Sequence, residues 1–117
     1  MPLVLPRLYA ILDPAQLAGR PVGEVCDALL SAGVKLIQYR AKRPATRKLF
    51  EDCVQLAVRV HQAEGLFIVN DRADVAAASR ADGVHVGQDD LPIEMARAVV
   101  GAGKLVGFST HNLEQVA

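Results

Sequence analysis

Three polar side chains follow one another at alternate positions of a short segment: Gln38, Arg40 and Lys42. Alternate residues of a strand point to the same face, so Gln38 and Arg40 share one face, and Lys42 joins them if the extended path continues. At a rise of about 3.3 Å per residue, the two cations reach more than one oxygen of a diphosphate. The alternative is a solvated strand end, but a Gln and an Arg are costly to bury on an apolar strand without partners. The spacing therefore favours an anion-binding strand end, with Tyr39 and Ile37 directed to the other face.

Two carboxylates stand at comparable places further along the chain. Asp71 and Asp90 each follow a short apolar run that predicts a strand. Mg²⁺ takes one or two carboxylates and completes its shell with water and substrate phosphate, so a pair on one rim would suit it. Each aspartate could equally cap the helix that follows, Asp71 with Asp74 three residues on and Asp90 before Pro92. Spacing alone leaves both interpretations open.

Three further polar residues are less informative by themselves. Asn70 could orient a ligand amide or stabilise a turn, and Ser109 could donate to a ring or cap a helix. His85 lies between Val84 and Val86 and should face opposite to them, where a hydrogen-bonded core histidine is favoured over a catalytic base. No His or Cys group has zinc-ligand spacing, and no serine lies in a nucleophile elbow.

The apolar pattern predicts the elements that must position these groups. Strands are expected at 8–12, 34–39, 66–69, 84–86 and 104–108, with helices over 22–30, 49–60, 75–79 and 93–100 and a fifth helix starting at Asn112. Strands that alternate with helices predict a parallel sheet with the helices outside. Polar clusters at the carboxyl ends of successive strands are how an α/β barrel builds an active site. A closed barrel needs eight such units in about 250 residues, so the expected fold is a truncated (βα)₈ TIM barrel with its first five parallel strands and about four helices.

Composition limits the classes of function. The 117 residues are 51% hydrophobic, and 13 basic residues balance 13 acidic ones, which argues against nucleic-acid or membrane-surface binding through bulk charge. Cys26 and Cys53 fall on the apolar stripes of expected helices, so buried thiols are expected rather than a disulfide or a metal site. Residues 1–7 have neither the basic start nor the long apolar stretch of a signal peptide or membrane span, so a cytoplasmic protein is expected.

Four segments of this chain together resemble the thiamine phosphate synthase family. Residues 38–42 match its Gln-x-Arg-x-Lys strand end, and residues 70–71 match its Asn-Asp pair. Residues 81–90 match its Ala-Asp-Gly-Val-His-x-Gly-Gln-x-Asp segment, and residues 107–111 match its Gly-x-Ser-x-His segment. The matches keep the order and intervals of the family over nearly the whole chain, and this makes the resemblance specific.

The resemblance implies a (βα)₈ barrel and an enzyme that joins 4-amino-2-methyl-5-hydroxymethylpyrimidine diphosphate to a thiazole phosphate, with release of diphosphate. It implies a set of residues that bind the pyrimidine diphosphate: Gln38, Tyr39, Arg40, Ala41, Lys42, Asn70, His85 and Ser109. Arg40, Lys42 and Ser109 are the expected catalytic residues, and Asp71 and Asp90 are the expected Mg²⁺ ligands. Cleavage of the carbon–oxygen bond leaves negative charge on the diphosphate, which Mg²⁺, Arg40 and Lys42 would stabilise without a general base.

The family pattern continues past the last residue of this chain. The threonine- and lysine-bearing loop and the glycine-rich thiazole phosphate site of the family would lie beyond Ala117. We therefore expect a single partial barrel domain, 1–117, cut at the start of the fifth helix, that keeps only the pyrimidine diphosphate and metal half-site. The open edge of such a sheet predicts a homo-oligomer or another association that covers it. The alternatives are a thiaminase-like or pyrimidine-binding barrel of the same superfamily, and an inactive half-barrel that acts only in assembly.

Overall fold

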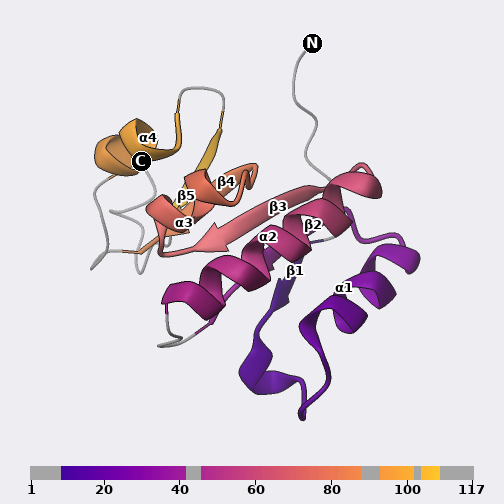
Figure 1. Ribbon diagram of the computed structural model, residues 1–117. Helices are drawn as coiled ribbons and strands as arrows, with labels where there is room; N and C mark the ends of the chain where they lie inside the picture. Colours follow the sequence, from indigo (N-terminus) through magenta and orange to yellow (C-terminus); the bar gives the residue numbers. More distant parts are fainter. Residues whose placement is uncertain (1–8, 42–45, 88–92, 102–103, 109–117) are drawn as a thin grey trace, which may run out of the picture.

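The computed structural model describes residues 9–41, 46–87, 93–101 and 104–108, which form one parallel sheet with helices packed against it (Figure 1). The strands, in spatial order, are β1 (Tyr9–Leu12), β2 (Leu36–Tyr39), β3 (Leu66–Asn70), β4 (Gly83–Val86) and β5 (Leu105–Phe108). Between them lie the 3₁₀ turn η1 (Pro14–Gln16) and the helices α1 (Val22–Ser31), α2 (Thr46–Gln62), α3 (Ala73–Ala78) and α4 (Ile93–Val100). The expected α/β class with five parallel strands is confirmed.

About half of the strand and helix ends differ from the expected positions by one to three residues, and β2 shows why. The apolar run begins at Val34, but the strand begins at Leu36. The Val34 N–H donates to the carbonyl of Leu29 at 3.1 Å, after Gly33 with φ of 96°, so these residues close α1 instead of starting the strand. The expected fifth helix at Asn112 lies outside the described residues.

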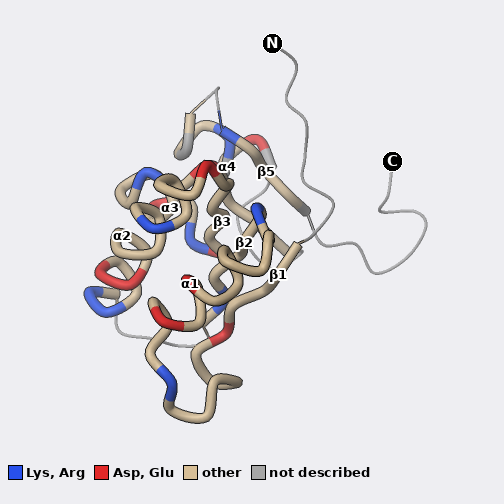
Figure 2. Tube along the Cα trace, turned by 90° about the vertical axis from the view of Figure 1, so that its right-hand side faces the viewer, with Lys and Arg blue, Asp and Glu red and all other residues tan. Residues whose placement is uncertain are grey.

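The core lies between the sheet and the helix layer. In Figure 2 the helices α1, α2 and α3 lie on one side of the strands. Seven of the strand residues that face them are at most 1% exposed: Leu12, Ile37, Tyr39, Phe67, Val69, Val84 and Val86. The helix α2 covers them with Leu49, Cys53, Leu56 and Val60, which recur at helical spacing on one face. On the opposite face of β1, Tyr9 and Ile11 are 47% and 55% exposed.

Both cysteines are free and buried, as expected from their places on the apolar stripes. Cys26 lies in α1 and Cys53 in α2, and each is fully shielded from solvent. Burial disfavours a thiolate, and it raises the pKa of Cys26 to about 11 and that of Cys53 to about 12, with the Asp52 carboxylate adding to the shift at Cys53. No helix among the described residues is long and apolar enough to cross a membrane.

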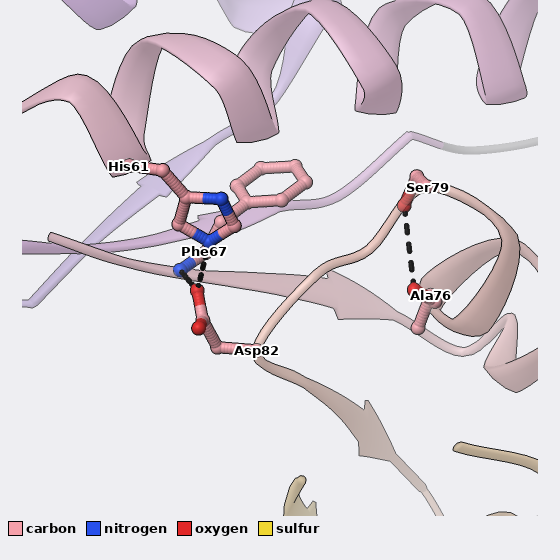
Figure 3. Close-up of polar contacts among 5 residues, drawn as sticks. All are labelled: His61, Phe67, Ala76, Ser79 and Asp82. Carbon is pink, nitrogen blue, oxygen red and sulfur yellow. Dashed lines mark hydrogen bonds and ion pairs between the residues drawn. The ribbon is translucent and has the colours of Figure 1, made fainter. Parts of the chain in front are cut away.

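Asp82 links the amino ends of the central strands through hydrogen bonds (Figure 3). Its Oδ2 accepts a hydrogen bond from the backbone N–H of Phe67 at 2.7 Å and lies 2.7 Å from Nε2 of His61 on α2. Its own N–H donates to the carbonyl of Phe67 at 2.8 Å, and its carbonyl accepts from Leu105 at 2.8 Å. In the same view the Ser79 hydroxyl donates to the carbonyl of Ala76 at 3.5 Å, at the end of α3. One residue thus ties β3, β5 and α2 together.

The next residue, Gly83, is glycine because the neighbouring strand leaves no room for a side chain. A Cβ there would clash with the backbone oxygen of Leu105. Gly83 therefore makes the first contact between β4 and β5, opposite Leu105.

Asp82→Ala should lower the free energy of unfolding by about 1–3 kcal/mol, because it leaves the buried N–H of Phe67 without its acceptor. Asp74→Ala is the matched control: it removes a carboxylate that is 65% exposed and paired with Arg72, and should cost less than about 1 kcal/mol. Urea denaturation of both variants measures the difference. An equal loss of unfolding free energy in the two variants would contradict the role of Asp82 in linking the strands.

The buried thiols predict a loss of stability at high pH. The pKa of Cys53 rises from 9.0 to about 12 in the fold, so its contribution is complete below about pH 9 and is lost as the pH rises toward 12. Urea denaturation between pH 8 and about pH 11 should show this decline, and Cys53→Ala should reduce the slope. A slope unchanged in Cys53→Ala would contradict the assignment.

Candidate functional site

Parallel pairing brings the carboxyl ends of β2 and β3 to the same edge of the sheet. The two strands pair in register, with Tyr39 opposite Val69. Arg40 follows β2 directly, and its N–H still donates to the carbonyl of Leu12 on β1 at 3.0 Å. Asp71 follows β3 directly, and its N–H donates to the carbonyl of His85 on β4 at 2.7 Å. An exposed cation and an exposed carboxylate therefore lie at the same carboxyl edge, each directly after its strand.

The face of the sheet turned away from the helices carries the amide side chains. Gln38 is only 3% exposed, and its side-chain amide lies 2.9 Å from the side-chain amide of Asn70, within hydrogen-bond distance. Asn70 is paired in register with His85 on the next strand. Sequence-predicted residues from three strands, Gln38, Asn70 and His85, therefore lie on this inner face.

Tyr9 joins this group, although the sequence pattern did not single it out. Its hydroxyl is in hydrogen-bond contact with the side-chain amide of Gln38. Tyr9 is paired with Leu36, two residues before Gln38, so register places both on the inner face. Burial raises the pKa of the Tyr9 phenol, so it is protonated at neutral pH. Only the pairing of β1 with β2 could have revealed it, and that pairing is a tertiary feature.

The backbone at Asp71 takes a left-handed conformation, with φ of 69°. Aspartate tolerates this region better than most residues with a side chain. The Arg72 N–H donates back to the carbonyl of Asn70 at 2.9 Å, so the chain turns sharply where the strand ends. The N-cap position of α3 is Arg72, so Asp71 does not occupy the helix-capping position that was its alternative role. This turn therefore places Asp71 directly after the end of β3.

His85 lies on the inner face, opposite in direction to the buried Val84 and Val86, as expected. It is half-buried and stands opposite Gly107 of β5. A Cβ at Gly107 would come within 2.7 Å of Nδ1 of His85, so the ring occupies the space that a side chain on β5 would need. Glycine at position 107 therefore leaves room for the His85 imidazole on the inner face.

The side chains of two expected substrate-binding residues, Tyr39 and Ala41, lie on the helix side of the sheet. The Tyr39 side chain points to the helix layer, where its hydroxyl donates to Oδ2 of the buried Asp52 at 2.7 Å, and Lys48 approaches the other carboxylate oxygen at 2.8 Å. Burial and this carboxylate both raise the pKa of Tyr39. Ala41 likewise packs against the core. Because alternate residues of a strand face opposite ways, Tyr39 and Ala41 have only their backbones to offer at the carboxyl edge.

Several predicted site residues lie outside the described residues: Lys42, Asp90 and Ser109. Within the described residues no three His, Cys, Asp or Glu side chains gather as a metal cluster. At the carboxyl edge of the sheet Asp71 therefore contributes a single carboxylate. One carboxylate suits a hard cation that keeps water and phosphate oxygens in its shell. A shallow hollow of about 700 Å³ lies elsewhere, between α2 and α3, lined by residues such as Phe50, Val54 and Ser79. It holds none of the predicted site residues.

The chain is similar to known proteins in both sequence and fold. The chain is 44% identical over 108 residues to thiamine-phosphate synthase of Lawsonia intracellularis, which covers 92% of this chain and 50% of that protein. It is 42% identical over 109 residues to thiamine-phosphate synthase of Persephonella marina, covering 93% of this chain and 52% of that protein. Its fold matches the solved thiamine phosphate pyrophosphorylase from Pyrococcus furiosus with a TM-score of 0.82 and 36% identity, over 92% of this chain and 51% of that one.

The chain thus spans about half the length of the curated relatives it matches. The family model described as thiamine monophosphate synthase matches residues 8–117, which include every predicted site residue. With the parallel βα fold and the polar carboxyl edge, this match shows that the chain belongs to the thiamine monophosphate synthase family.

Proposed function

We propose that the carboxyl edge of this sheet binds a pyrimidine diphosphate, and that the protein to which these residues belong joins it to a thiazole phosphate to make thiamine phosphate. The observation that carries the proposal is the meeting of Arg40, the Gln38–Asn70 amide pair and Asp71 at one edge. The names of the relatives support the reaction, and the chain's coverage of about half of their length supports assigning it one side of that reaction.

Arg40 and the two amides have complementary tasks in this proposal. The guanidinium of Arg40 is exposed at the edge, where it offers a planar set of donors to phosphate oxygens. Gln38 and Asn70 are held by each other on the inner face, where their amides suit the ring nitrogens and amino group of a pyrimidine. Lys42 and Ser109 complete the site by their places in the family motif, Lys42 on the phosphates and Ser109 beside the ring.

The donor set fits Mg²⁺. Asp71 supplies one carboxylate from a strand end that faces solvent, and Asp90 is the second ligand proposed from the motif. When bound, Mg²⁺ would neutralise charge on the diphosphate. Arg40 and Lys42 would add fixed positive charge on the same oxygens, where negative charge grows as the bond between the pyrimidine methylene and the diphosphate breaks. The chain's own residues thus act by binding and by stabilising the leaving group, without a nucleophilic side chain.

The binding of the thiazole phosphate is assigned to the half of the relatives' length that this chain does not cover. We propose that 1–117 is a partial barrel domain that carries the pyrimidine diphosphate and metal half-site, in a cytoplasmic enzyme. Among the described strands, β1 pairs only with β2 and β5 only with β4, while Tyr9 and Ile11 lie exposed on the inner face. Such edges and such a face favour association with further strands, from another part of the protein or from a second copy.

Calorimetric titration of the chain with the pyrimidine diphosphate should show binding that depends on Mg²⁺. Arg40→Ala should weaken it at least about tenfold, because charge-assisted contacts to phosphate are lost. Asp71→Ala should remove most of its dependence on the metal. Arg80→Ala is the matched control: Arg80 is exposed and lies after α3, at the amino edge of β4, so binding should not change.

Binding that stays the same in both site variants would contradict the proposed site. The same titration with the pyrimidine alcohol, which has no diphosphate, separates the main alternative. Tight, metal-independent binding of the alcohol would favour a thiaminase-like or pyrimidine-binding barrel over a synthase.

A further inference from the structure

Four side chains form a continuous row of polar contacts from β1 to the end of β3. The Tyr9 hydroxyl touches the Gln38 amide, and the Gln38 amide touches the Asn70 amide at 2.9 Å. The Asn70 amide stands in turn beside the Asp71 carboxylate. Tyr9 is therefore linked to Asp71 through two amides, although the two residues come from opposite ends of the row.

The direction of the hydrogen bonds in this row decides whether a donor or an acceptor of Asn70 faces the Asp71 carboxylate. With the Asn70 nitrogen turned to Gln38, the Asn70 oxygen faces the carboxylate, and two acceptors oppose each other. Turning the amide over places its nitrogen 3.0 and 3.1 Å from the two carboxylate oxygens of Asp71 and its oxygen toward Gln38. A hydrogen bond to a charged acceptor is stronger than one between neutral groups, so the second direction is favoured at this end.

The hydrogen bonds at the Tyr9 end of the row must then run in the same direction. Once the Asn70 oxygen faces Gln38, the Gln38 nitrogen must turn to it as the donor, and the Gln38 oxygen then points to Tyr9. Gln38 is 3% exposed, so its oxygen has little access to water and depends on a protein donor. A phenol hydroxyl supplies that donor, whereas a phenylalanine could not.

We propose that Tyr9 is a positioning residue for Asp71: its hydroxyl donates to Gln38, Gln38 donates to Asn70, and Asn70 donates to the Asp71 carboxylate. The aligned row holds both amides in one orientation and fixes the carboxylate that the proposed function assigns to Mg²⁺. Hydrogen bonds aligned in a row reinforce one another, so removing the first donor weakens the last contact. The inference rests on the proposed function for the identity of the cation, but the row itself is a property of the metal-free chain.

The test compares Tyr9→Phe with the matched control Ile11→Val, which trims the same face of the same strand without a polar change. In the metal-free chain, NMR of the side-chain amide groups should show the Asn70 signals displaced in Tyr9→Phe and unmoved in Ile11→Val. Titration with Mg²⁺ and inorganic pyrophosphate should give about 3- to 10-fold weaker binding for Tyr9→Phe alone. In an Asn70→Ala background, Tyr9→Phe should bring no further loss, because the row is already broken.

Undisturbed Asn70 signals in Tyr9→Phe, or a full additional loss of affinity in the Asn70→Ala background, would overturn the proposal. Failure of the unmodified chain to bind Mg²⁺ and pyrophosphate would contradict the proposed function instead, and the metal-free NMR comparison would still decide the role of Tyr9. A Tyr9→Phe chain that binds normally with unmoved amide signals would leave the function standing and end the inference.

Discussion

The in-register pairing of parallel strands is the constraint on which the rest of this structure depends. It makes β2, β3 and β4 end side by side, so that residues far apart in the chain, Arg40, Asp71 and His85, come to one edge. A shift of one residue in one strand would turn its side chains to the opposite face. Backbone hydrogen bonds therefore bring these residues to one edge, and side-chain contacts act only on how the groups are oriented there.

One face of the sheet carries the packed core, and the other face carries polar residues of the candidate site. The helix-facing residues are nearly all buried and apolar, with Tyr39 and Asp52 as a satisfied polar pair among them. The inner face carries Gln38 and Asn70, which hydrogen-bond to each other. Tight packing on one face thus allows the other to keep polar groups that a core would not tolerate alone. At the opposite, amino edge, Asp82 holds the strand starts, which follows the usual division of an α/β barrel into a stabilising end and a reactive end.

Much of this could be predicted from the sequence, for definite physical reasons. The period-two alternation along 37–41 placed Gln38 and Ile37 on opposite faces, and the apolar runs located all five strands. Tyr9 could not be found this way, because its partner Gln38 is 29 residues away and depends on strand register. The left-handed turn at Asp71 was also hidden, since aspartate suits helix caps and turns alike. Local pattern shows which face a residue takes, and tertiary pairing decides which residues it meets.

Paramagnetic broadening by Mn²⁺ bound with pyrophosphate tests most directly whether the carboxyl edge is one metal-diphosphate site. In a backbone NMR spectrum of the chain, substoichiometric Mn²⁺ should broaden the signals of residues 40–41, 70–71 and 85–87 first. The signals of residues 33–35, 63–66 and 80–82, at the amino edge, should stay sharp. Broadening centred on the amino edge, or spread evenly over the helices, would contradict the account.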